Sequence, residues 1–102
     1  MQSSQTKPIH FFISFTALPE KQAEFHRVVT GVQSALPNVS GCLQVMVFGH
    51  EESPNQFSIL ETWDSQAAHQ NHVEELQSSG KWDEIRALLT SDPKGMYLHS
   101  LK

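Results

Sequence analysis

The sequence predicts an α+β domain with the element order β-α-β-β-α-β, and three observations lead to this prediction. Over residues 9–17, every second residue is apolar and most of the residues between them are polar, which is the period-two pattern of a strand. Two apolar runs, residues 42–48 and 57–63, flank a polar connector and indicate an antiparallel hairpin. Stretches with apolar residues at helical spacing precede and follow this hairpin. Together these elements predict a four-stranded antiparallel sheet with helices on one face.

The first strand, residues 9–17, divides its side chains between the two faces of the sheet, because successive residues of a strand point in opposite directions. One face carries Ile9, Phe11, Ile13, Phe15 and Ala17, and the other carries His10, Phe12, Ser14 and Thr16.

A helix is predicted over residues 19–36. Pro19 stands at its first position, where the missing N–H is not needed. An amphipathic helix is indicated by one apolar stripe, which consists of Phe25, Val28, Val29, Val32 and Leu36. Pro37 and Asn38 end the helix.

The hairpin follows, with residues 50–55 as its connector, because the sequence Glu-Glu-Ser-Pro-Asn within it suits a turn. Gly41 precedes the first hairpin strand, where a residue without Cβ can adopt a backbone conformation that other residues avoid. Asp64 or Ser65 is expected to cap the next helix by accepting hydrogen bonds from its first N–H groups.

The second helix is predicted in two pieces, residues 65–76 and 81–90, interrupted at residues 77–80. The least polar stripe of the first piece consists of Ala67, Ala68, His72 and Leu76. In the second piece, Trp82, Ile85, Leu88 and Leu89 stand at helical spacing. Residues 96–101 form the last strand, which completes the split βαβ arrangement called ferredoxin-like.

Both faces of the first hairpin strand are mostly apolar. Cys42, Gln44, Met46 and Phe48 stand on one side, and Leu43, Val45 and Val47 on the other. A single layer of helices covers only one face of a sheet, whereas a sheet with one wet face alternates apolar and polar residues. We therefore expect a second copy of the chain to cover the open face, which gives a homodimer through the sheet faces.

Length and composition limit the alternatives. A chain of 102 residues is long enough for a single domain, expected over residues 9–102 after a flexible leader of residues 1–8. A net charge of −4 with only seven Lys and Arg residues argues against nucleic acid as a partner. No stretch approaches the roughly 18 apolar residues of a membrane span, and no signal peptide is recognisable, so we expect a cytoplasmic protein without a membrane partner. The single cysteine, Cys42, agrees with a reducing compartment.

Three motifs relate the chain to a known family. They are the Pro-led helix start PEKQAEF, the junction formed by Pro37, Gly41, Cys42 and Leu43, and the strand end formed by Phe57, Glu61, Trp63 and Ser65. The chain thereby resembles the antibiotic biosynthesis monooxygenase family of dimeric α/β-barrel proteins over about residues 9–101. His72 stands nine residues after Trp63, where family members commonly carry a histidine.

The resemblance implies a homodimer whose sheets form a barrel, with a ligand pocket in each subunit between sheet and helices. Known members oxidise polycyclic aromatic or quinol-like substrates with dioxygen and without metal or flavin, degrade haem, or act on small signalling metabolites. Haem degradation is disfavoured here, because the first strand offers Ser14 in the neighbourhood where those members have an asparagine, and the helix offers Trp82 where they have the haem-ligating histidine. A cofactor-independent monooxygenase of a small aromatic, phenolic or quinone-like substrate is therefore expected. The alternative is a non-catalytic metabolite-binding or stress-related protein.

His72 and Glu61 are the expected catalytic residues. The pKa of a histidine, near 6.5, suits proton transfer near neutral pH, so His72 is a candidate general base or a donor to a substrate oxygen. Alternatively, it packs the helix against the rim of the sheet. Glu61 lies on a largely apolar strand and needs a partner. It exchanges a proton with His72 or the ligand, or it pairs structurally with Arg27 or Arg86.

Aromatic residues supply the expected substrate-binding set. Trp63, Trp82 and Phe12 are candidate flat walls for an aromatic ligand, or else plain core residues. Ser14 and Tyr97 complete the set, although the sequence leaves open whether Tyr97 faces the pocket or the dimer interface. His69 and His72 together provide only half of a tetrahedral zinc site, so we expect neither a metal nor a cofactor.

Overall fold

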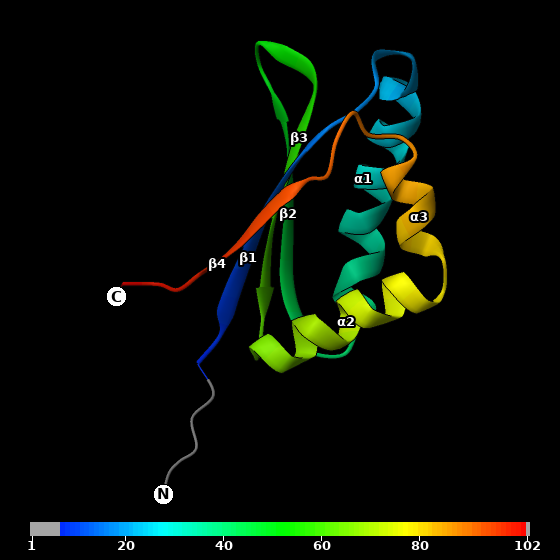
Figure 1. Ribbon diagram of the computed structural model, residues 1–102. Helices are drawn as coiled ribbons and strands as arrows, with labels where there is room; N and C mark the ends of the chain where they lie inside the picture. The colour runs from blue at the N-terminus through cyan, green and yellow to red at the C-terminus, as the bar shows by residue number, and fades with distance from the viewer. Residues whose placement is uncertain (1–6, 102) are drawn as a thin grey trace, which may run out of the picture.

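The structure is a computed structural model that describes residues 7–101, so residues 1–6 of the expected leader lie outside the described part. Within this described part, four strands and three α-helices follow one another in the predicted order (Figure 1). They are β1 (Ile9–Thr16), α1 (Gln22–Ala35), β2 (Cys42–His50), β3 (Ser53–Trp63), α2 (Gln66–Ser78), α3 (Lys81–Arg86) and β4 (Lys94–Leu98). Short 3-10 turns, Pro19–Lys21 and Leu36–Asn38, flank α1.

The four strands form one antiparallel sheet in the order β2-β3-β1-β4. All three helices lie on the same side of this sheet (Figure 1). The strands β1 and β3 lie at the centre of the sheet, and every residue of β1 pairs with a residue of β3. Phe11 is opposite Glu61, and Phe15 is opposite Phe57. The predicted fold class, ferredoxin-like with helices on one face, is confirmed.

The hairpin turn is shorter than the predicted connector. His50 pairs with Ser53, so only Glu51 and Glu52 lie between the two strands. The predicted connector extends too far along the chain, because Asn55 is held in β3 by Ala17. The Ala17 N–H donates to the Asn55 carbonyl at 2.8 Å, and Nδ2 of Asn55 donates to the Ala17 carbonyl at 3.2 Å.

The start of β2 contains a bulge that the sequence did not reveal. Cys42 pairs with Trp63 while Gln44 pairs with the adjacent Thr62, so Leu43 is an extra residue in the ladder. The side chain of Leu43 is exposed. The prediction that Cys42 shares a face with Gln44 is therefore wrong, because the bulge interrupts the alternation.

Ser65 caps α2, as one of the two predicted caps, by accepting a hydrogen bond from the Ala68 N–H at 3.1 Å. A left-handed Gly80, with φ of +83°, separates α2 from α3. The last helix ends at Arg86, short of the predicted residue 90, because Leu89 instead forms an isolated bridge with Ala17.

The core lies between α1 and the helix-facing side of the sheet. The rings of Phe15 and Phe57 each lie 5.2 Å from the ring of Phe25, which is almost completely buried. Burial of such aromatic residues contributes strongly to folding. The other buried members of this core are Ala17, Val29, Ile59, Leu88 and Leu89.

The other face of the sheet is open and carries both apolar side chains and internal hydrogen bonds. Its exposed large residues include Met46, Phe48, Met96 and Leu98. Three polar pairs lie between them: His10 with Thr62 at 2.9 Å, Ser14 with Ser58 at 3.1 Å, and His50 with Ser58 at 2.9 Å. Within residues 7–101 there is no helix of the length and apolar character needed to cross a membrane.

Candidate functional site

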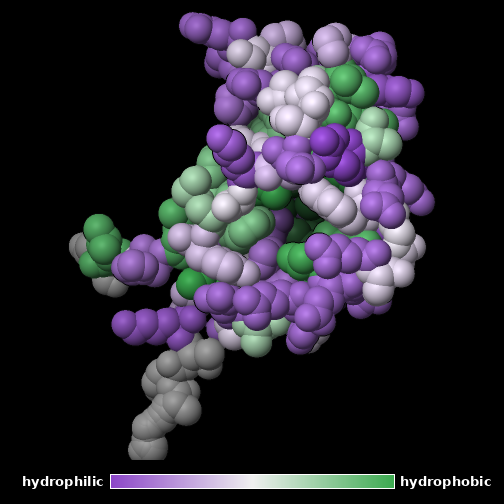
Figure 2. Space-filling model, viewed as in Figure 1, coloured by the Kyte–Doolittle hydropathy of each residue, from purple (hydrophilic) through white to green (hydrophobic). Residues whose placement is uncertain are grey.

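A cavity of about 840 Å³ lies between the sheet and the helices. Figure 2 shows the surface hollowed there, with hydrophobic residues at the rim of the hollow. The cavity is largely lined by apolar side chains of β1, β3 and the helices, among them Phe11, Ile13, Ile59, Val28, Val32, Leu76, Trp82 and Ile85. Such a cavity is large enough for a small organic ligand.

One part of the cavity is polar. Glu61 extends into it from β3, and His69 and His72 extend into it from α2. Side chains three residues apart on a helix lie on the same face, which explains why both histidines reach the cavity. Glu61 and His69 are both buried.

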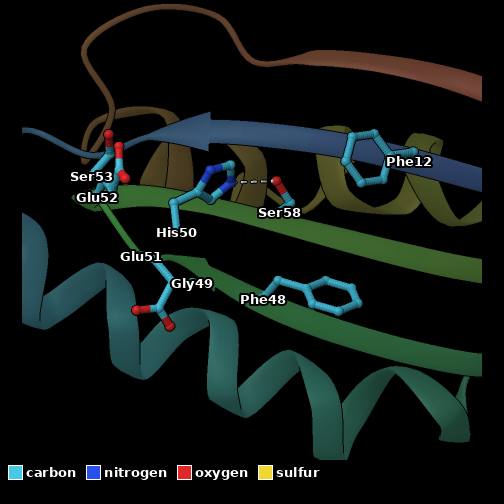
Figure 3. Close-up of a pocket in the computed structure, with 8 residues that line it drawn as sticks. All are labelled: Phe12, Phe48, Gly49, His50, Glu51, Glu52, Ser53 and Ser58. Atoms are coloured by element: carbon cyan, nitrogen blue, oxygen red, sulfur yellow. Dashed lines mark hydrogen bonds between the residues drawn. The ribbon is translucent and has the colours of Figure 1, made fainter.

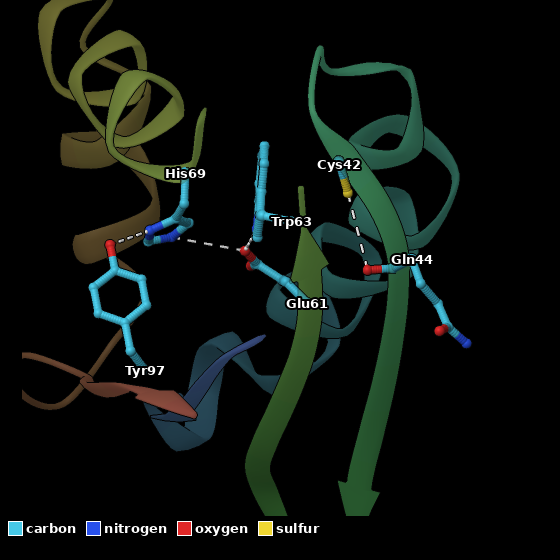
Figure 4. A network of polar contacts seen from close by, with 6 residues as sticks. All are labelled: Cys42, Gln44, Glu61, Trp63, His69 and Tyr97. Atoms are coloured by element: carbon cyan, nitrogen blue, oxygen red, sulfur yellow. Dashed lines mark hydrogen bonds and ion pairs between the residues drawn. The ribbon is translucent and has the colours of Figure 1, made fainter. Parts of the chain in front are cut away.

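Hydrogen bonds hold this polar part together (Figure 4). The indole Nε1–H of Trp63 donates to Oε1 of Glu61 at 2.8 Å. Nδ1 of His69 lies 2.8 Å from the hydroxyl oxygen of Tyr97, and its Nε2 lies 3.8 Å from the same Glu61 oxygen. The ring of His72 lies 5.4 Å from the Trp63 ring, at an interplanar angle of 32°. The structure thus places α2, β3 and β4 around a single cluster.

Burial controls the charges of this cluster. It lowers the pKa of His69 to about 4, with a further contribution from His72. It also lowers the pKa of His72, against the opposing effect of Glu75. The pKa of Glu61 is raised by burial and partly restored by the Trp63 hydrogen bond. Both imidazoles are therefore neutral at pH 7.

Glu61 does not form the structural ion pair with arginine that the sequence offered as an alternative. Its side chain meets Trp63 and His69, whereas Arg86 binds Asp92 at 2.6 Å. That alternative is wrong for Arg86. Arg86 lies where the chain turns back toward β4, and there its guanidinium group forms an ion pair with Asp92. Arg27 lines the cavity, but within residues 7–101 it makes no ion pair with Glu61.

The expected substrate-binding residues separate into two groups. Trp82 lines the cavity, and Trp63, which is completely buried, lies behind Glu61 and His72 rather than in the cavity wall. Phe12 and Ser14 lie on the opposite face of the sheet, since they alternate with Phe11 along β1. We therefore correct the set by leaving out Phe12 and Ser14.

Tyr97 lies on the helix-facing side of β4, which settles the face that the sequence left open. It pairs with Phe11 across the strands, and its hydroxyl reaches His69. The ring of Tyr97 is partly exposed, and burial of the hydroxyl raises its pKa. Tyr97 therefore reaches the polar cluster from the outer edge of the sheet.

His69 and Phe11 line the cavity but were not among the predicted site residues, since the sequence analysis considered His69 only as a metal ligand. The ring of Phe11 lies 4.1 Å from that of His69, and both line the cavity. The predicted stripe on this helix included Ala67 and Ala68, but the cavity-facing residues are His69, His72, Val73 and Leu76. Their spacing, at i, i+3, i+4 and i+7, was the signal available in the sequence.

The described residues contain no group of three or more His, Cys, Asp or Glu side chains arranged to hold a metal ion. His69 and His72 are near each other, but the other neighbours of His69 include the aromatic residues Phe11, Trp63 and Tyr97.

A second, more open depression lies on the other face of the sheet, near the hairpin turn (Figure 3). Its volume is about 610 Å³, and His50 extends across it toward Ser58. The remaining lining residues are Phe12, Phe48, Gly49, Glu51, Glu52 and Ser53. This depression belongs to the open face and is separated from the cavity by the sheet.

Comparisons with known proteins identify relatives of the chain. Residues 8–79 match a family model described as antibiotic biosynthesis monooxygenase. No curated protein matches the chain.

Among solved structures, PA3566 from Pseudomonas aeruginosa is 22% identical, with a TM-score of 0.79 and coverage of 97% of this chain and 99% of that one. Rv0793 from Mycobacterium tuberculosis is 14% identical, with a TM-score of 0.81 and coverage of 94% and 97%. A mutant of SnoaB, a cofactor-independent oxygenase from Streptomyces nogalater, is 16% identical, with a TM-score of 0.78 and coverage of 94% and 95%. These likenesses confirm the fold.

Proposed function

Because the chain belongs to the antibiotic biosynthesis monooxygenase family, we propose that it is a cofactor-independent monooxygenase of a small aromatic, phenolic or quinone-like molecule. The observation that carries the proposal is the apolar cavity with neutral imidazoles and a carboxyl group gathered in one part of it. An apolar chamber with a nearby base suits a substrate that must be deprotonated before it reacts with dioxygen.

His72 is the proposed general base. Its lowered pKa keeps the imidazole neutral at pH 7, so the ring can take a proton from a ring CH₂ or hydroxyl group of the substrate. Either deprotonation leaves negative charge on a ring carbon, which then takes up dioxygen. One oxygen atom stays on that carbon as a carbonyl, and the other leaves as water with two hydrogens that the substrate gives up, both from the CH₂ group or one each from C–H and O–H. Glu61 is the proposed second proton acceptor in the same part of the cavity.

Apolar residues position the substrate in this proposal. Trp82 extends from α3 into the cavity, and Phe11 extends from the sheet. Flat aromatic side chains bind an aromatic ligand through its faces and edges. The buried Trp63 acts indirectly, because its hydrogen bond holds Glu61 and its ring supports His72.

Replacing His72 by glutamine is expected to lower the rate of oxygen consumption with a reactive quinol by about 100-fold, since general-base catalysis contributes at least this much. The measurement uses an oxygen electrode and a panel of naphthoquinols and anthrones, with the non-enzymatic rate subtracted. His26→Gln is the matched control, because His26 is exposed on α1. Equal rates of oxygen consumption in His72→Gln and His26→Gln would show that His72 is not the general base. Binding of the panel without any oxygen uptake by the wild-type protein would favour the non-catalytic alternative.

We also propose that the open face of the sheet binds a second copy of the chain. Met46 and Phe48 are each 42% exposed and Met96 is 52% exposed, although all three lie on one sheet face. Large apolar side chains gathered in this way mark an interaction surface.

A cytoplasmic location stays a prediction.

Met46→Glu is expected to convert the protein from a dimer to a monomer, because a charge would then be buried without a partner in the interface. Light scattering after size exclusion measures the mass directly. The control is Ala23→Glu, which adds the same charge to the exposed surface of α1. A wild-type protein with the mass of one chain at high micromolar concentration would refute the proposed dimer.

A further inference from the structure

Two polar atoms in the cavity face each other across a gap that no hydrogen bond spans. Nε2 of His69 and Oε1 of Glu61 are 3.8 Å apart, beyond the range of about 2.7–3.2 Å for an N–H···O hydrogen bond. Both side chains are buried, and both line the cavity. No other hydrogen bond to Nε2 is found within the described part of the chain. A buried N–H without a partner is costly, and the separation of these two atoms suits a polar group that contacts both.

The hydrogen bonds around the gap fix the direction of each donor. Oε1 of Glu61 already accepts the indole N–H of Trp63, so it presents lone pairs to its surroundings. The imidazole proton of His69 is therefore favoured on Nε2, facing this oxygen. Nδ1 of His69 then accepts the hydroxyl proton of Tyr97, 2.8 Å away. Burial raises the pKa of Tyr97 and keeps this phenol protonated as a donor.

Aromatic packing prevents the imidazole from turning away from the gap. The Phe11 ring lies 4.1 Å from the His69 ring, and the Trp63 and Tyr97 rings lie at 5.5 and 5.3 Å. These neighbours come from β1, β3 and β4, so three strands hold one helical side chain. The position of Nε2 relative to Glu61 is thus built into the fold.

We propose that His69 and Glu61 together bind a hydroxyl group of the ligand, with Tyr97 as the positioning residue for His69. A ligand oxygen about 2.8 Å from each atom can bridge the gap, accepting from Nε2–H and donating its own proton to Glu61. A phenol or an enol satisfies both sides, whereas an ether or a ketone leaves Glu61 without a donor. The inference rests on the proposed function in that it concerns the same cavity, and it specifies the chemical group that is recognised there.

The test compares two probes with the same ring system, 1-naphthol and its methyl ether, 1-methoxynaphthalene. We expect the wild-type protein to bind the naphthol at least about tenfold more tightly at pH 7, because the site pairs a hydroxyl with both a donor and a carboxyl group. Titration calorimetry or quenching of tryptophan fluorescence provides the affinities. His69→Phe should abolish the preference, while the exposed control His26→Phe should retain it.

The tautomer of His69 gives a second readout that needs no ligand. Nitrogen chemical shifts of the imidazole should show the proton on Nε2 in the wild-type protein, and a mixture of tautomers in Tyr97→Phe. A proton on Nδ1 in the wild-type protein would overturn the inference. So would equal affinity for the two probes, or no binding of 1-naphthol at its solubility limit.

The same experiments separate this inference from the proposed function. A preference for the naphthol without oxygen uptake from any quinol would contradict the monooxygenase and leave the hydroxyl site standing. Oxygen uptake that depends on His72, without any preference between the two probes, would do the opposite.

Discussion

Replacing Gly41 by alanine is expected to lower the free energy of unfolding by about 2–5 kcal/mol, through backbone strain and overpacking together. Gly41 has a φ of +90°, a conformation that residues with a Cβ rarely adopt. A Cβ added there would lie 2.5 Å from Cβ of Ala68 and 3.1 Å from Oδ1 of Asp64. Chemical denaturation measures the change, which is a large share of the stability of a small domain.

Two other glycines separate the two causes. Gly80 also has a positive φ, of +83°, but nothing lies within 4 Å of an added Cβ, so Gly80→Ala should cost only about 1–2 kcal/mol. Gly31 lies in α1 with equal space around it, and Gly31→Ala should stabilise the helix by about 0.5–1 kcal/mol. If Gly41→Ala cost no more than Gly80→Ala, the contact with Ala68 would be without consequence.

The stability of the protein is expected to fall as the pH is lowered from 6.5 toward 4, by up to about 3 kcal/mol from His69. The pKa of His69 is about 4 in the folded protein and returns to its ordinary value of 6.5 on unfolding. Between these values the unfolded chain binds the proton first, so acid favours unfolding. The contribution is complete above pH 6.5 and is lost as the pH falls through 4.

The groups around His69 modify this profile. His72, whose pKa is also lowered, acts in the same direction. Glu61, whose pKa is raised, acts in the opposite direction and offsets part of the loss. Tyr97 releases its proton only in alkali and does not contribute to the acid range.

Urea denaturation at pH values from 4 to 8 separates the contribution of His69 to stability from that of the other titrating groups. The curve of free energy of unfolding against pH should be flatter for His69→Phe than for the wild-type protein. His26→Phe, on the exposed side of α1, should preserve the wild-type slope. Parallel curves for His69→Phe and the wild-type protein would show that His69 keeps an ordinary pKa when folded.

Local sequence patterns were sufficient to predict the fold. The alternation along β1 and the apolar stripe through Phe25 and Val29 depend only on neighbours in sequence, and both are confirmed. The element ends were less predictable, because tertiary pairing decided them. Ala17 forms a backbone hydrogen bond with Asn55, which therefore belongs to β3, and a β-bridge with Leu89, which therefore lies outside the last helix.

The candidate site was only partly predictable, for the same reason. Glu61 and His72 were predicted from their residue types and, for His72, from the family resemblance, and the structure places both at one cavity. The role of Tyr97 depends on which face of β4 it occupies, and only the pairing of β4 with β1 decides this. The sequence suggested His69 only as a metal ligand, because its partners Tyr97 and Glu61 are distant in sequence and are brought near by the sheet.

The hydrogen bonds on the open face of the sheet have a consequence for assembly. Three hydrogen bonds form there within a single chain, between His10 and Thr62, Ser14 and Ser58, and His50 and Ser58. In the proposed dimer these paired atoms need no partner from the second copy, so the contact between copies would depend mainly on apolar side chains such as Met46, Phe48 and Met96. Apolar contacts lack directional constraints, so small changes in side-chain shape can alter the affinity between two copies without disturbing either sheet.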